Sequence, residues 1–355
     1  MEKLSSNLDL IGSYKNLPQV RESNVEVLRL IATFFIIFIH SNFLSLGVPQ
    51  SEDFICNPIS TLIRTLFETL GIIGVNCFIF ISGWFGILLK IKGIVNLLFQ
   101  CAWFYILISL IFNIIGITTF ELSHIKRYLF ADDWFIVCYL LLMILSPILN
   151  SFVENTRKEV FRNVLILYFL FTFTYGTISS LSAFNGGYST IFFIGYYLLI
   201  RYIRIHRPKF SSMPMIFDIL MYLSISVLLC LLFRYKIPVL GNFSYLNPLI
   251  ILSSIHFSLI FTKFSYKSRT VNWLAASAFS VYLLHGVPGI FNQLKSLFYY
   301  LFSTCSTLEF WVLDIAIIFL IIIISIILDQ PRKRIFNYLI NLKNVRLILK
   351  KIVLS

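Results

Sequence analysis

Residues 24–43 read NVEVLRLIATFFIIFIHSNF, and this stretch indicates the class of fold. It is a largely apolar run of about 20 residues, the length that an α-helix needs to cross the hydrocarbon core of a bilayer. Arg29 and His40 lie inside this run, although a charged residue near the centre of a membrane helix costs roughly 2.5–3.5 kcal/mol. Residues of this kind usually face a protein interior and carry a function. The stretch therefore predicts a membrane helix with a polar, functional face.

Arg29 and His40 share one face of this helix. They are 11 residues apart, which at 100° per residue returns to within about 20° of the same direction, roughly 16 Å along the axis. Glu22, Glu26 and Thr33 fall within about 60° of Arg29, while Phe and Ile fill most of the remaining surface. Arg29 could instead reach the cytoplasmic headgroups, and His40 could bond to a neighbouring helix. The shared polar stripe favours a functional interior.

The rest of the chain has the same membrane character. Of 355 residues, 58% are hydrophobic and 13% are charged, against about 25% charged residues in an ordinary soluble domain. Mean hydropathy is +0.87, and these values together exclude a soluble globular domain. Apolar runs and their breakers predict an all-α integral membrane bundle of about ten transmembrane helices. The expected spans are residues 25–44, 70–89, 94–116, 134–150, 161–178, 188–204, 215–233, 245–262, 271–289 and 309–328.

The basic residues indicate the orientation of the bundle. The formal net charge is +13, and of 29 Lys and Arg, 23 fall on one side of the expected spans and 6, Arg64 among them, on the other. Because cytoplasmic loops carry the excess of Lys and Arg, both termini are expected in the cytoplasm. The same charge in a soluble chain would suggest nucleic acid, but its placement in short loops excludes that partner. The first span is long enough to remain as a signal anchor, so a multi-pass plasma-membrane protein is expected.

A single membrane domain is expected over residues 1–331. Residues 332–355 mix Lys and Arg with Leu and Ile, which indicates a basic amphipathic tail on the anionic cytoplasmic leaflet. The six cysteines show no C-x-x-C pattern, and no group of residues has the spacing of metal ligands. No metal is therefore expected.

Three further segments carry recognisable motifs. The second span contains the motif Phe78 to Trp84, with Ser82-Gly83, within GIIGVNCFIFISGWFGILL. The fourth reads DDWFIVCYLLLMILSPILN, with W-F-x-x-x-Y followed by L-x-P-x-L-N, and the ninth contains FSVYLLHGVP. Together with R-x10-H in the first span, these motifs resemble the acyltransferase 3 family of bacterial integral membrane O-acyltransferases, in its surface polysaccharide-modifying branch. The resemblance covers about residues 24–290.

The resemblance implies an enzyme that takes an acyl group, usually acetyl, from cytoplasmic coenzyme A. The acceptor would be a hydroxyl of a cell-surface glycan or of its polyprenyl-linked precursor. Acetyl-CoA is rich in phosphate, and Arg29, Lys90 and Lys92 lie on the cytoplasmic side where it would dock. Many relatives carry Arg-x-x-Arg soon after the Ser-Gly motif, and here Lys90 and Lys92 are expected to supply that charge instead. Ser82 is expected in helix packing or in the donor channel.

Acyl transfer to a hydroxyl needs a base or a nucleophile, and an imidazole with a pKa of about 6.5 can be either. His40 is the candidate, and whether it acts as base or as acyl carrier stays open. His285 lies at a similar depth, about 21 Å along its helix against 22 Å for His40, and could touch the site or be an ordinary core residue. Asp133, with Asp132, could orient a catalytic imidazole, or both could be loop charges.

Trp134 and Tyr139 are candidate substrate-binding residues in the fourth span, although Trp134 is equally typical of an interfacial aromatic belt. Two other classes compete with the enzyme. A transporter or flippase of lipid-linked oligosaccharide would also use many spans with a polar interior, but the sequence shows no clear repeat or paired helix breaks. A catalytically silent scaffold would leave the polar stripe of the first span unexplained.

Overall fold

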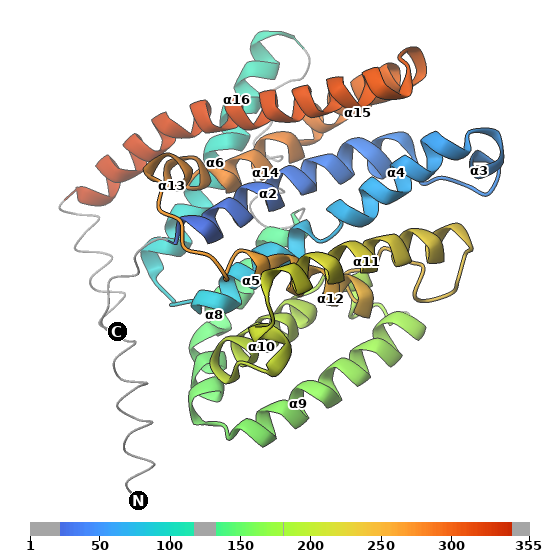
Figure 1. Ribbon diagram of the computed structural model, residues 1–355. Helices are drawn as coiled ribbons and strands as arrows, with labels where there is room; N and C mark the ends of the chain where they lie inside the picture. The colour runs from blue at the N-terminus through green and yellow to red at the C-terminus, as the bar shows by residue number, and fades with distance from the viewer. Residues whose placement is uncertain (1–21, 117–132, 180, 343–355) are drawn as a thin grey trace, which may run out of the picture.

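The computed structural model describes residues 22–116, 133–179 and 181–342, and every regular element in these ranges is a helix (Figure 1). In chain order they are α2 (Ser23–Ile39), the π-helical turn η1 (His40–Leu44), α3 (Asp53–Cys56), α4 (Pro58–Gly71), α5 (Gly74–Phe85), α6 (Ile91–Ile114), α8 (Trp134–Asn155), α9 (Lys158–Phe171), η2 (Thr172–Ile178), η3 (Asn185–Gly187), α10 (Thr190–His206), η4 (Lys209–Ser212), α11 (Met215–Arg234), α12 (Pro248–Ile260), α13 (Arg269–Ala275), α14 (Ala278–Gly286), α15 (Pro288–Thr304) and α16 (Thr307–Asn341).

The structure confirms the predicted all-helical architecture and contains helices that can cross a bilayer. Within the described ranges, 7 continuous helical segments are long and apolar enough to do so, and α14 with α15, bent by 78°, would make 8. The seven segments are Ser23–Leu44, Pro58–Phe85, Ile91–Ile114, Trp134–Asn155, Lys158–Ile178, Met215–Arg234 and Thr307–Asn341. The chain is therefore a multi-pass membrane protein.

Two of the expected spans are short helices of the bundle interior. The expected span 188–204 corresponds to α10, which has 17 residues, and the span 245–262 corresponds to α12, which has 13. At 1.5 Å per residue α12 is about 20 Å long, less than the hydrocarbon thickness of about 30 Å. Both helices pack on α5 and bury much of their surface. Their apolar composition therefore serves contacts between helices as well as contacts with lipid.

The stretch 45–69, which the sequence indicated as an outer loop, contains the helices α3 and α4. Thr61, Arg64, Thr65 and Glu68 recur on one face of α4, and all four are buried. A hydropathy scan scores these polar residues as a break, although they face other helices. Arg64, counted from the sequence as an outer-loop cation, is only 6% exposed. The second span therefore begins at Pro58.

The last helix continues beyond its expected end near residue 328. It runs through Pro331 to Asn341, so the expected domain boundary at residue 331 falls inside α16. Arg332, expected in a tail on the leaflet surface, is 2% exposed, and its Nε donates a hydrogen bond to Asp329 Oδ1 at 2.7 Å. The part of the expected tail from residue 343 onward lies outside the described residues.

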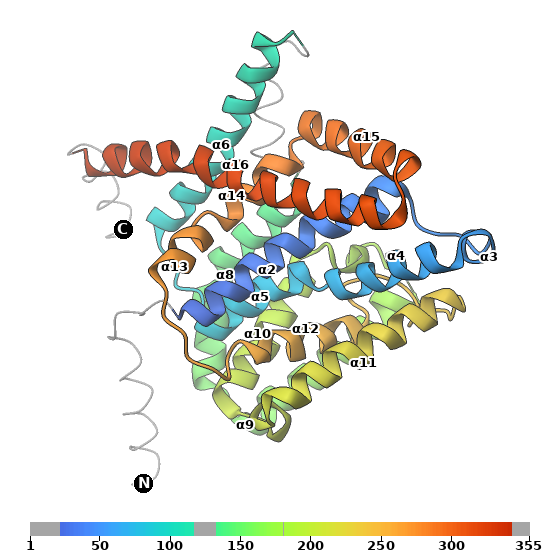
Figure 2. The same ribbon diagram turned by 45° about the horizontal axis from the view of Figure 1, so that its top comes forward.

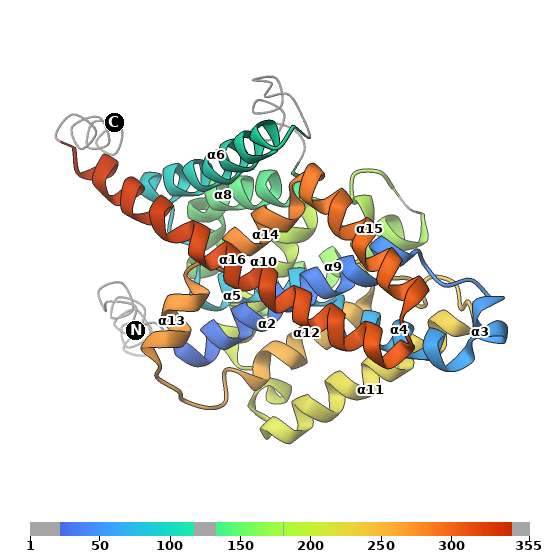
Figure 3. The ribbon, with the colours of Figure 1, turned by 90° about the horizontal axis from the view of Figure 1, so that it is seen from above.

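The helix α2 lies at the centre of the bundle, where it contacts α4, α5, α13, α14 and α16 (Figures 1 and 2). Its first turn is fixed by a hydrogen bond from Asn24 Nδ2 to the carbonyl of Phe261 at 2.6 Å. The short helix α14 packs against α2, α6 and α16, and α16 passes across α2 when the bundle is seen from above (Figure 3). The polar face of α2 is thereby brought against α14.

Candidate active site

Two histidines from distant parts of the chain meet between α2 and α14. The Nδ1 atom of His40 lies 3.1 Å from Nε2 of His285, and their ring centroids are 5.2 Å apart. His285 is 1% exposed, whereas His40 is partly exposed. His40 begins the π-helical turn η1 that continues α2, and single π-helical turns of this kind are frequent at functional sites. The structure thus joins the two histidines that the sequence placed at similar depth.

The hydrogen bonds around His285 fix the tautomers of both neutral rings. Nδ1 of His285 lies 2.7 Å from the carbonyl oxygen of Val281, and a carbonyl can only accept, so this nitrogen carries the proton. A neutral imidazole has one donor and one acceptor, so Nε2 of His285 accepts. Nδ1 of His40 must then donate to it, which leaves Nε2 of His40 unprotonated with its lone pair free. An imidazole whose tautomer is set by its second nitrogen is the arrangement of a base held by a partner.

The free nitrogen of His40 is the reactive atom of this arrangement. No residue in the described part of the chain is within hydrogen-bonding distance of His40 Nε2. The ring of Phe291 stands edge-on to the imidazole, with centroids 6.0 Å apart. This nitrogen can therefore remove a proton from a hydroxyl or attack a carbonyl carbon.

The polar face of α4 holds the π-helical turn that carries His40. Asn42 Nδ2 donates to Glu68 Oε2 at 2.9 Å and to the carbonyl of Arg64 at 2.8 Å. The guanidinium of Arg64 donates to Asn42 Oδ1 at 3.1 Å and to the carbonyl of Gly47 at 2.6 Å. Sequence reasoning missed these residues, and the signal was available in the spacing of polar residues along 61–68.

Asp133 holds a tyrosine next to the histidine pair. Its Oδ1 accepts hydrogen bonds from the hydroxyl of Tyr282 at 2.8 Å and from the backbone N–H groups of Phe135 and Ile136 at the start of α8. The ring of Tyr282 lies edge-on to His285, at 6.0 Å between centroids. Asp133 was expected to bind an imidazole, but in the structure it binds the hydroxyl of Tyr282. The carbonyl of Val281 orients His285 instead. Burial raises the pKa of the Asp133 carboxyl, and Asp132 lies outside the described residues.

Ser82 and Tyr139 also come together. Their hydroxyl oxygens are 3.2 Å apart, and Ser82 Oγ also donates to the carbonyl of Phe78 at 3.1 Å. The ring of Phe135 stacks on Tyr139 at 5.9 Å and lies 5.3 Å from the ring of Tyr282. The motifs of the second, fourth and ninth expected spans are therefore joined into one continuous set of contacts.

Trp134 belongs to a separate aromatic cluster at the start of α8. Its ring lies 4.5 Å from that of Tyr188, 5.9 Å from that of Phe193 and 6.2 Å from that of Tyr245, measured between centroids. Its ring also contacts that of its neighbour Phe135, which leads to Tyr282 and the histidine pair. Trp134 therefore lies beside the set of contacts that contains His40.

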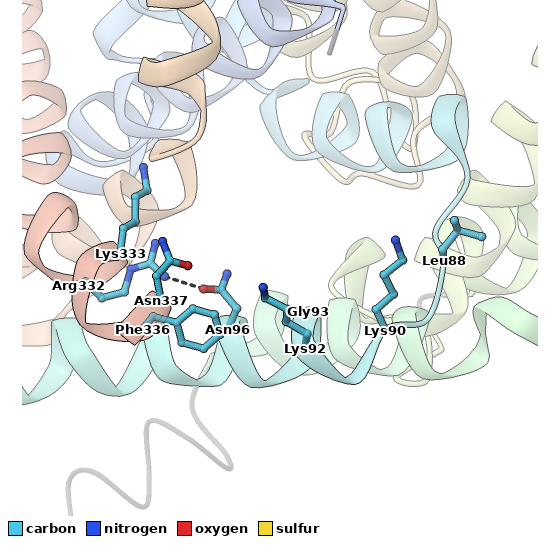
Figure 4. A pocket seen from close by; sticks show the side chains of 9 residues that line it. All are labelled: Leu88, Lys90, Lys92, Gly93, Asn96, Arg332, Lys333, Phe336 and Asn337. Atoms are coloured by element: carbon cyan, nitrogen blue, oxygen red, sulfur yellow. Dashed lines mark hydrogen bonds between the residues drawn. The ribbon is translucent and has the colours of Figure 1, made fainter. Parts of the chain in front are cut away.

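The three basic residues expected to bind the donor lie in two places. Arg29 donates from Nε to Glu26 Oε2 at 3.1 Å, and its side chain is 32% exposed. Lys90 and Lys92 line a pocket of about 430 Å³ between the start of α6 and the end of α16, and Arg29 is not among its lining residues (Figure 4). The structure therefore joins Lys90 to Lys92 and leaves Arg29 on the face of α2.

Comparison with known proteins identifies the family. Residues 22–330 match the acyltransferase domain of the acyltransferase 3 family. The chain belongs to that family. This membrane acyltransferase contains all of the motifs described above within the matched range, including both histidines. No curated protein and no solved structure matches the chain.

Proposed function

We propose that this acyltransferase is a bacterial plasma-membrane O-acetyltransferase that moves an acetyl group from cytoplasmic acetyl-CoA to a hydroxyl of a cell-surface glycan or of its polyprenyl-linked precursor. The observation that carries the proposal is the His40–His285 pair, with the lone pair of His40 Nε2 free. Family membership supports acyl transfer as the chemistry. The choice of an acetyl group and of a glycan acceptor rests on the resemblance of the motifs to those of polysaccharide-modifying relatives.

The chemistry that this pair supports is general-base or nucleophilic catalysis. As a base, His40 Nε2 takes the proton of the acceptor hydroxyl while its oxygen attacks the thioester carbonyl. The C–S bond breaks, the thiolate of coenzyme A leaves, and the imidazolium returns the proton to that sulfur. As a nucleophile, the same nitrogen would first accept the acyl group while the C–S bond breaks and the thiolate leaves. The acceptor hydroxyl would then attack the acyl carbon, the C–N bond would break, and the hydroxyl proton would pass to the thiolate. In both cases His285 keeps the tautomer and orientation of His40.

The charge distribution supports a cytoplasmic donor. In the proposed bundle of ten membrane helices with both termini in the cytoplasm, Arg29, Lys90 and Lys92 all lie at the inner end. His40 is 11 residues further along α2 than Arg29, about 16 Å nearer to the outer side. The donor's phosphates can then be held by these cations while the thioester reaches the histidine pair.

The acceptor is proposed to enter from the outer side. Trp134 and Tyr139 lie near the outer end of α8, and both have partly exposed rings. Amphipathic aromatic faces of this kind can pack against the apolar face of a sugar while their polar atoms stay hydrogen-bonded. Both rings contact Phe135, which in turn lies against Tyr282 beside the histidine pair.

One observation favours the alternative of a transporter or flippase. The helices α14 and α15 are bent by 78° directly after His285, and broken membrane helices are typical of transport sites. Family membership favours acyl transfer over transport. The two functions differ in what happens to the thioester, because a transporter leaves acetyl-CoA intact.

Release of free coenzyme A tests the proposal directly. The full-length protein in nanodiscs is given acetyl-CoA, with and without a membrane extract that contains the glycan or its lipid-linked precursor, and the free thiol is measured. We expect thiol release that depends on the extract and is accompanied by acetyl incorporation into it. Absence of thiol release, together with movement of lipid-linked oligosaccharide across the bilayer, would establish the transporter instead.

A further inference from the structure

The basic pocket has a wall that lies beyond the family match. The match ends at residue 330, whereas Arg332, Lys333, Phe336 and Asn337 of α16 line the same pocket as Lys90 and Lys92 (Figure 4). We propose that this pocket binds the adenosine bisphosphate end of acyl-CoA and that the last turns of α16 hold its phosphates. This inference rests on the proposed function, because it assigns a place to the donor of that reaction.

The charge of the pocket points to an anionic ligand. Four of its lining residues are basic and none is acidic. Asp329, which is not among the lining residues, pairs with Arg332 at 2.7 Å and with Lys333 at 3.1 Å. The amines of Lys90 and Lys92 have no hydrogen bond or ion pair with any residue in the described ranges. Cations gathered around one space repel one another unless an anion joins them, and a nucleotide with several phosphates is such an anion.

The two cations of α16 are held in fixed positions. The guanidinium of Arg332 donates to Asn96 Oδ1 at 2.7 Å, and Lys333 Nζ donates to Ser277 Oγ at 2.6 Å. A cation that only sets membrane orientation can stay in solvent, as Arg334 of the same turn does. Arg332 is buried, Lys333 is partly exposed, and both are hydrogen-bonded, as is typical of groups held ready for a ligand.

The size and the remaining lining fit a nucleotide. The volume of about 430 Å³ falls inside the range of about 300–1,000 Å³ that small-molecule sites occupy. Leu88 and Phe336 supply apolar surface, and the Phe336 ring packs against that of Phe99, at 5.5 Å between centroids. Asn96 and Asn337 add amide groups. A purine has the same needs, an apolar contact for its face and polar partners for its edge.

The pocket is connected to the histidine pair through α14. Lys333 contacts Ser277 just before α14, Gln100 Nε2 donates to Ser280 Oγ at 2.6 Å, and the same helix carries His285 near its other end. Eight residues separate Ser277 from His285, about 12 Å along a helix axis. The pantetheine arm of coenzyme A separates its phosphates from its thioester, and it can follow this helix from the pocket toward the pair.

An anionic lipid headgroup would present the same phosphate chemistry, so the test uses probes that separate the two sources. The full-length protein is placed in nanodiscs of zwitterionic lipid, and adenosine 3′,5′-bisphosphate competes with acetyl-CoA in the acetylation assay. Lys92→Gln and Lys333→Gln are compared with Arg334→Gln, which removes the same charge from an exposed position of α16. Lys92→Gln disturbs no contact in the described structure and guards against misfolding of the Lys333 variant.

We expect the bisphosphate to compete, and each of the two pocket variants to raise the KM for acetyl-CoA roughly tenfold, the loss expected for a charge-assisted hydrogen bond. Their kcat should change little, and Arg334→Gln should match the wild type. Unchanged KM in both pocket variants would overturn the inference while leaving acyl transfer standing. Competition by anionic lipid but not by the bisphosphate would also overturn it. Direct titration of the nanodisc protein with the bisphosphate provides a readout without turnover, and binding that is weakened by Lys92→Gln but accompanied by no acyl transfer would support the pocket and remove the proposed function.

Discussion

At the scale of residues, one carbonyl oxygen determines which nitrogen of His40 can react. Val281 fixes the proton of His285 on Nδ1, and His285 in turn fixes the proton of His40 on Nδ1. The reactive Nε2 then needs no carboxylate partner to keep its lone pair. His285 is in this account a positioning residue, because it acts through His40 and not on the substrate.

This role makes a prediction for substitutions of His285. His285→Gln offers an amide oxygen that can still accept from His40 Nδ1, so activity should fall by roughly tenfold. His285→Leu removes the acceptor and should lower activity by roughly a hundredfold or more, within the range that general-base catalysis contributes. Glycan O-acetylation per unit of membrane protein measures both, with His206→Gln at the inner end of α10 as a control. Equal activity of the Gln and Leu variants would show that the hydrogen bond from His40 does not matter.

At the scale of elements, α4 serves as a support for the catalytic turn. Its buried polar face binds η1 through Asn42 and the loop after it through Gly47, while the Arg64 guanidinium also lies over the ring of Phe302 in α15, 5.0 Å from its centroid. A π-helical turn interrupts the regular hydrogen bonds of a helix. The contacts from α4 compensate for that interruption and hold His40 toward α14.

Substitution of Glu68 tests this support. Glu68→Gln keeps an oxygen that accepts from Asn42, so it should retain most of the activity. Glu68→Ala leaves the buried Asn42 amide without this acceptor, which should cost about 1–3 kcal/mol of stability and lower acetylation. Thermal unfolding in detergent and glycan acetylation are measured together, with Glu52→Gln at an exposed position as the control. If Glu68→Ala kept wild-type stability and activity, the claim that α4 supports the turn carrying His40 would be contradicted.

At the scale of the whole molecule, the mechanism requires the donor and the two chain termini on one side. The uneven split of Lys and Arg between the two sides predicts that reporter fusions at residue 355 and near residue 206 are cytoplasmic. Fusions near residues 55 and 183 should be external. Enzymatic reporters active on only one side of the membrane measure this directly. An external reporter at residue 355 would place the basic pocket away from cytoplasmic acetyl-CoA and contradict the donor route.

The sequence was sufficient to predict the helical membrane architecture and the similar depth of His40 and His285, because helix geometry converts residue counts into depth. Whether the two histidines touch was left open by the sequence, because it depends on how α2 and α14 pack. The sequence did not reveal α4, because the buried polar residues of that helix lower its hydropathy to the value typical of a loop. It also placed Arg332 in a surface tail, because Pro331 is typical of a helix end, yet the helix continues through it. The partner of Asp133 depended on how α8 and α14 pack, which no local pattern contains.

If the imidazole of His40 performs the chemistry, substitution by glutamine should remove that chemistry and little else. Glutamine is similar in size and can hydrogen-bond, but it cannot exchange a proton near neutral pH. The measurement is the O-acetyl content of surface glycan in cells that carry His40→Gln, with the membrane level of the protein and its acetyl-CoA binding as controls. We predict that acetylation is abolished while both controls stay near wild type. Full acetylation in these cells would contradict the catalytic role of His40 and leave the transporter as the better account.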